Sequence, residues 1–180
     1  MNPISARRVA RLGAMVVLLV LPATASAQYR LPALIASAKA DSLHEAASRM
    51  VAAHRWRDAA RLHRESAKLR APEDPLGFRC LSEAGAIAYA LRDRSAARSD
   101  MADAAAHALA RGDLRAAALA YLDAAWIAQE QNRPRLVWEH GHRAEMLAAS
   151  PLLAPVDRLA IVQRISRAQE SMQLAMRQAP

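Results

Sequence analysis

Strong helix formers fill the chain and are interrupted at short intervals by residues that end helices. About a quarter of the 180 residues are alanine, whereas 5 are glycine and 4% are aromatic. From Leu34 onward, apolar residues recur at spacings of three and four, the period of an amphipathic helix. The breaks fall near residues 54–55, 72–75, 92–93, 112–113, 132–134 and 150–155. We therefore expect an all-α fold of about seven helices, each about 14 to 22 residues long.

The breaks between these expected helices are very short. Short connections force successive helices to pack antiparallel as neighbours. Asp93 and Asp113 stand where an N-cap residue would accept the first free amides of a helix, and Pro134 stands where a first-turn proline is tolerated. Alanine at the crossing points would let the helices approach closely. The sequence thus predicts stacked helix hairpins, with a compact helical bundle as the alternative.

The first 27 residues have the layout of a secretory signal peptide. Three arginines, Arg7, Arg8 and Arg11, precede an apolar run over residues 12–21, and Ala25-Ser26-Ala27 forms a small-residue cleavage site. The run is shorter than the roughly 20 residues of a spanning helix, so an uncleaved anchor is the less favoured reading. We expect cleavage after Ala27, a single mature domain over 28–180 without a transmembrane segment, and a periplasmic or secreted location.

Charge and cysteine content exclude several classes of protein. The formal net charge is +8, and loss of the leader's three arginines would leave about +5. Export and the lack of an aromatic platform beside the basic residues argue against a nucleic-acid partner. Cys80 is the one cysteine, which rules out an internal disulfide and a paired-cysteine zinc motif. We expect Cys80 to be a buried apolar residue.

A self-comparison shows a repeated pattern. Asp93-Arg-Ser-Ala-Ala97 is similar to Asp113-Leu-Arg-Ala-Ala117, and each is followed by Asp-Ala-Ala. The stretch from Gly112 through Tyr121 to Ala124 resembles the second helix of a tetratricopeptide repeat, a helix hairpin of about 34 residues. Fitting that length to the chain gives candidate units at 40–73, 78–111 and 118–151, and a last helix at 156–177.

The resemblance implies an α-solenoid whose first helices line a groove that binds a protein or peptide. In the last helix, an apolar stripe is expected to cover the end of the array or to pair with another chain; it comprises Ile161, Ile165, Ala168, Met172 and Ala175. For Trp126, packing in the core is the competing reading. The expected partner-binding positions are His44, Glu45, Arg79, Glu83, Tyr89, Asp123, Trp126 and Glu130.

No catalytic motif is present, and we expect neither an enzyme, a cofactor nor a metal site. His140 and His142 are two apart, so on a continuous helix they would point in different directions and could not chelate together. His54 and Asp58 have a suitable spacing, but two ligands seldom make a site.

The most basic segment, residues 55–70, carries the alternative function. Arg57, Arg61, Arg64 and Lys68 lie at helical spacings of four and three. They would form an anion-binding stripe for lipid headgroups or cell-wall polymer, unless this is a solvated face in which Arg61 pairs with Glu65. The leading expectation is a non-enzymatic, exported interaction module or scaffold of the bacterial envelope, and its partner and oligomeric state are left open.

Overall fold

The computed structural model describes residues 33–178, with side chains to residue 170. The chain divides into two units, residues 1–39 and 40–180, and the second contains every helix from α2 onward. The expected signal peptide, 1–27, lies outside the described residues.

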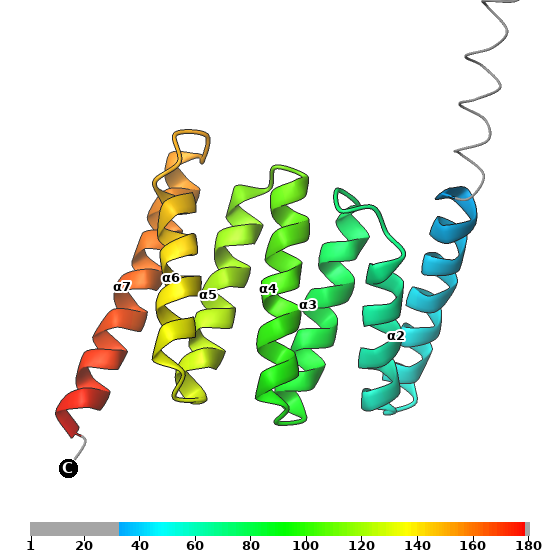
Figure 1. Cartoon of the computed structure of the whole chain (residues 1–180), viewed down its shortest axis with the longest axis horizontal. Coiled ribbons are helices and arrows are strands. Elements are labelled where there is room, and N and C mark those ends of the chain that lie inside the picture. Colours follow the sequence, from blue (N-terminus) through cyan, green and yellow to red (C-terminus); the bar gives the residue numbers. More distant parts are fainter. Residues whose placement is uncertain (1–32, 179–180) are drawn as a thin grey trace, which may run out of the picture. The chain divides into compact units, whose positions relative to one another are not determined.

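The described residues form helices joined by short loops, which confirms the predicted all-α class. Residues 33–52 are helical. None of the helices in the described part of the chain is both long enough and apolar enough to cross a membrane. The helices that follow are α2 (Trp56–Lys68), α3 (Pro75–Ala90), α4 (Arg94–Ala110), α5 (Leu114–Glu130), α6 (Pro134–Ala148) and α7 (Pro155–Gln178) (Figure 1).

Four of the loops share one backbone conformation. A residue in the left-handed region occurs in each, at His54, Arg92, Gly112 and Asn132, with φ between 53° and 77°. The next helix begins two residues later in every case. Asp93 and Asp113 follow the left-handed residue and accept from the amides of Ala96 and Ala116, which confirms the predicted caps. The repeated turn returns each helix antiparallel to the last.

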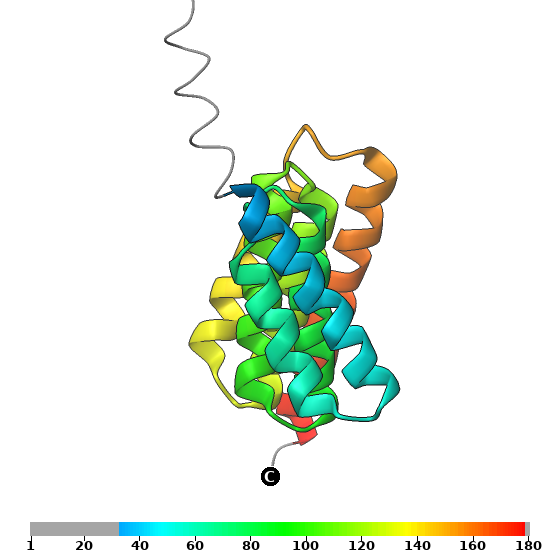
Figure 2. The same ribbon diagram turned by 90° about the vertical axis from the view of Figure 1, so that its right-hand side faces the viewer.

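Each helix from α2 to α6 packs against the next one in the chain (Figure 1). Figure 2 shows the same helices after a rotation of 90°, with successive helices overlying one another. Contacts between neighbours in sequence are typical of a helical solenoid or bundle. The last helix, α7, contacts both α5 and α6, more sparsely than those two contact each other.

The helix pairs agree with the predicted hairpins, but their spacing is longer. The second helices α2, α4 and α6 begin at Trp56, Arg94 and Pro134, which are 38 and 40 residues apart. The expected units at 78–111 and 118–151 therefore start inside α3 and α5 rather than at their first residues. The longer period arises because α3 has 16 residues and α4 and α5 have 17 each, with three-residue loops between them.

Small residues occupy the helix crossings. Every helix from α2 to α6 has at least one fully buried alanine: Ala59, Ala84, Ala97, Ala104, Ala117 and Ala144 are examples. Towards the C-terminal end, Ile161 of α7 is fully buried in a cluster with Tyr121. Ile165 packs against the same cluster, so the first part of the predicted stripe covers α5 and α6. The side chains of Met172 and Ala175 lie outside the described residues.

Two mid-helix glycines provide a matched test of this close packing. A Cβ atom at Gly141 would meet nothing within 4 Å, whereas at Gly85 it would lie 3.3 Å from the Ala97 carbonyl oxygen. Gly141→Ala should therefore gain the helix propensity of alanine, about 1 kcal/mol, in free energy of unfolding. Gly85→Ala should show a smaller increase in free energy of unfolding, or none, because the added Cβ atom would press against α4. Urea unfolding measures both, and an equal gain at the two positions would contradict close packing at Gly85.

Candidate functional site

A groove of about 790 Å³ lies between α5, α6 and α7. It forms where α7 packs sparsely against the preceding hairpin. The lining is mostly apolar and includes Leu122, Ala125, Trp126, Val137, Trp138 and Ile165.

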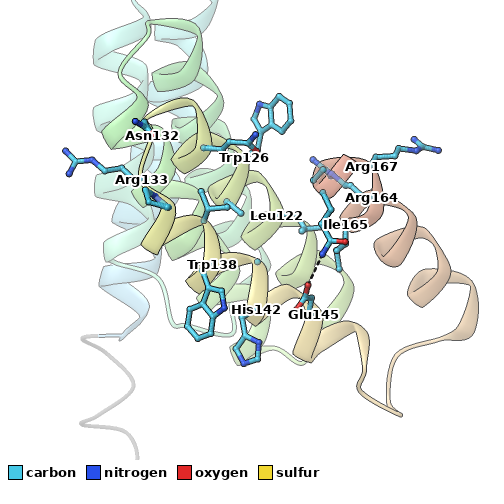
Figure 3. A pocket seen from close by; sticks show the side chains of 17 residues that line it. Leu122, Trp126, Asn132, Arg133, Trp138, His142, Glu145, Arg164, Ile165 and Arg167 are labelled. Atoms are coloured by element: carbon cyan, nitrogen blue, oxygen red, sulfur yellow. Dashed lines mark hydrogen bonds between the residues drawn. The ribbon is translucent and has the colours of Figure 1, made fainter. Parts of the chain in front are cut away.

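Two tryptophans dominate the surface of this groove. The exposed fraction is 45% for Trp126 of α5 and 70% for Trp138 of α6. Figure 3 shows Trp138 beside His142, and the two rings stack with their centroids 5.2 Å apart. Large exposed aromatic groups at a concave site are typical of surfaces that capture a partner.

Charged side chains line the edge of the groove. Arg164 pairs with Asp123, and Gln169 donates to a carboxylate oxygen of Glu145 over 3.5 Å. Figure 3 shows the side chains of Arg133 and Arg167 pointing away from the groove floor. The groove thus combines an apolar floor with a rim that holds several cations.

Of the predicted partner-binding residues, Trp126 lines the groove and Asp123 reaches its edge through Arg164. The exposed indole of Trp126 excludes the competing reading that it packs in the core. Tyr89 and Glu130 do not line this groove: the Tyr89 hydroxyl donates to Glu130 over 2.6 Å, a contact that ties α3 to α5. Sequence reasoning missed Trp138 because the resemblance placed the groove on the first helix of each hairpin, whereas Trp138 lies on α6, a second helix.

The other predicted residues lie towards the N-terminal end of the second unit. Glu45 is exposed and pairs with Arg49. Arg79 is also exposed and donates to Glu83 over 2.8 Å, and Glu83 also contacts a buried histidine, His63. The eight predicted positions therefore divide among separate local clusters rather than lining one groove.

Cys80 is buried in an apolar cluster with Ala67 and Leu81, as predicted, but polar groups also contact its sulfur atom. Its Sγ lies 3.4 Å from His44 Nδ1 and 3.6 Å from Ser66 Oγ. Burial raises the pKa of the Cys80 thiol, and burial also lowers the pKa of His63 against the opposing effect of Glu83. The groups that could bind an ion here are His44, His63 and Cys80, with one potential ligand atom from each within 4.8 Å of the others.

The basic stripe predicted on α2 is interrupted at Arg64. Arg64 forms a bidentate ion pair with Asp100 of α4, at 2.8 to 3.0 Å, and the Asp100 side chain is 6% exposed. Arg61 pairs with Glu65 at 2.9 Å, as the solvated-face reading predicted. Arg57 and Lys68 are exposed. Arg64 turns inward because a buried carboxylate needs a partner.

The two histidines of α6 lie in different surroundings. Helix α6 continues through Gly141, so His140 is buried against Tyr121 while His142 is exposed beside Trp138. His54 lies in a loop with positive φ.

Comparison with protein-family models, curated proteins and solved structures finds no match to this chain. The arrangement of helices is compatible with a helical repeat, and the finer resemblance to tetratricopeptide repeats stays a prediction.

The role of Arg64 can be tested against its neighbour Arg61. Arg64→Ala would leave the buried Asp100 carboxylate unpaired and should lower the free energy of unfolding by about 3 kcal/mol. Arg61→Ala removes a solvent-exposed pair and should cost less than about 1 kcal/mol. Equal losses in urea unfolding would show that Arg64 belongs to a solvated stripe.

His140 predicts a stability that falls in mild acid. Burial lowers its pKa below 6.5; Glu139 opposes this effect, while Arg98 and Arg143 add to it. Below about pH 6.5 the unfolded chain binds a proton that the folded ring does not take up until its lower pKa is reached. The free energy of unfolding therefore decreases across that interval. The free energy of unfolding is measured by urea titration at about pH 7 and about pH 5.5. The decrease between the two pH values should be smaller in His140→Leu than in the unmodified protein. The exposed control His142→Leu should show the same decrease as the unmodified protein.

Proposed function

We propose that this protein is an exported, non-enzymatic helical-repeat module that binds a protein or peptide in the groove between α5, α6 and α7. The observation that carries the proposal is the pair of exposed tryptophans, Trp126 and Trp138, at one concave apolar surface. Tryptophan is over-represented among the residues that contribute most of the binding energy at protein interfaces.

The chemistry of the groove favours a particular class of peptide. The apolar floor around Leu122, Val137 and Ile165 suits one or two large aliphatic side chains. Arg133, an exposed cation at the edge of the groove, would attract acidic residues next to that aliphatic anchor. The proposed ligand is therefore a segment with an aliphatic anchor and acidic neighbours.

Export to the bacterial envelope is part of the same proposal. It is supported by the basic, apolar and small-residue order of residues 1–27. The resemblance to tetratricopeptide repeats also supports a protein or peptide as partner, because that family uses stacked hairpins to present a binding surface.

Binding can be tested with two synthetic peptides on immobilised protein. The first carries two leucines flanked by aspartates, and the second carries lysines in place of the aspartates. We expect the acidic peptide to bind more tightly, and its affinity to fall as salt is raised because the rim cations are solvent-exposed. Trp126→Ala and Trp138→Ala should each weaken binding about tenfold or more.

The matched control is Trp56→Ala, which removes a tryptophan that is 39% exposed and lies outside the groove. This variant should bind the acidic peptide as the unmodified protein does. Equal affinity for both peptides, or equal loss in all three tryptophan variants, would refute the proposed groove.

A further inference from the structure

Three consecutive helices bring two histidines and the single cysteine together. His44 comes from the helix at 33–52, His63 from α2 and Cys80 from α3. One potential ligand atom from each residue lies within 4.8 Å of the other two. No sequence pattern predicts this group, because its members are 17 to 36 residues apart and follow no metal-binding spacing.

Two members of the cluster are almost completely buried. The exposed fraction is 1% for His63 and 0% for Cys80, and His44 is half-buried. His63 Nδ1 is buried and has no hydrogen-bond partner among the described residues. A buried polar atom without a partner carries a desolvation cost, and a bound cation would remove that cost.

The other ring nitrogen of His63 has a partner. Nε2 lies 3.1 Å from a carboxylate oxygen of Glu83, whose side chain is 34% exposed. Metal-binding histidines usually donate their second N–H to a carboxylate, which fixes the ring and makes the first nitrogen a better ligand. Both nitrogens of His63 are accounted for if Nδ1 binds an ion and Nε2 donates to Glu83.

The nearest buried cation is already neutralised. Arg70 donates to Ser66 Oγ, which is next to Cys80, and Arg70 pairs with Asp41 at 2.8 Å and Asp74 at 2.9 Å. Two carboxylates for one guanidinium leave no excess positive charge to repel an incoming dication.

We propose that His44, His63 and Cys80 bind Zn²⁺, with Glu83 as the positioning residue for His63. Two imidazole nitrogens and a thiolate are donors that suit this borderline-soft ion, which takes a fourth ligand in tetrahedral geometry. Cys80 loses its proton to solvent on binding. The complete burial of Cys80 favours a small ion over a substrate, and the half-buried His44 and partly exposed Glu83 mark the side from which the ion enters. The ion would join three helices and stabilise the N-terminal end of this unit.

The test uses the full chain, reduced and freed of metal. Zn²⁺ is titrated against a chromophoric chelator, and Co²⁺ is titrated alone as a spectroscopic substitute. We expect one Zn²⁺ per chain, a higher thermal unfolding temperature with Zn²⁺, and a thiolate-to-cobalt charge-transfer band. This band would report Cys80 specifically because the chain has one cysteine. A protein that binds no Zn²⁺, or binds Co²⁺ without the thiolate band, overturns the proposal.

Variants separate ligands from other buried groups. Cys80→Ser should abolish the charge-transfer band, and His63→Gln should weaken Zn²⁺ binding at least about tenfold. Glu83→Gln should weaken it about tenfold while retaining one ion per chain and the band. The matched control is His140→Gln, another buried histidine whose ring nitrogens lack partners, and it should bind Zn²⁺ unchanged. Circular dichroism confirms that each variant is folded. An equal loss of Zn²⁺ binding in the His140 variant would show that the loss is not specific to the three ligands and would reject the site.

Discussion

Close approach of antiparallel helices through alanine is the constraint on which this structure depends. Fully buried alanines such as Ala84, Ala97 and Ala117 bring neighbouring backbones together. A short turn with one left-handed residue precedes α2, α4, α5 and α6. Because the turns are short and the contact residues are small, each of these helices packs against the helix before it in the chain. The order of the helices in space therefore follows their order in the chain.

The groove exists because α7 departs from that rule. Its connection to α6 is longer than the three-residue turns, running from Ala149 to Ala154, and it packs against both α5 and α6. Ile161 is buried, whereas Val162 and Leu159 on the same helix are 45% and 58% exposed. The face of α7 that carries Ile161 thus covers the end of the core, and the sparse packing of α7 leaves both tryptophans of the groove exposed.

The sequence predicted the local features of the fold well and the contacts between distant residues poorly. Helix ends were predictable because Asp93, Asp113 and Pro134 are chemical signals within a few residues of the ends that they mark. The length of each hairpin was not predictable, because a helix can be one turn longer and still show the same three- and four-residue spacing of apolar residues. Trp126 was predicted as a binding residue, but its companion Trp138 was not. Both line one groove because α6 packs against α5, and no sequence pattern within α6 predicts that packing.

The same limit explains why Arg64 was placed on a solvated stripe. Its spacing from Arg61 and Lys68 is compatible with one exposed face, but Asp100 is 36 residues away and buried. An alanine-rich core buries little apolar area per residue, so each crossing contributes modestly to stability. Buried polar contacts such as Arg64 with Asp100, and Arg70 with Asp41 and Asp74, then fix which helix faces meet. A zinc ion bound by His44, His63 and Cys80 would act in the same way where the core is built from small side chains. In this chain, specificity of packing would come from charged and metal-binding groups because alanine alone distinguishes poorly between alternative crossings.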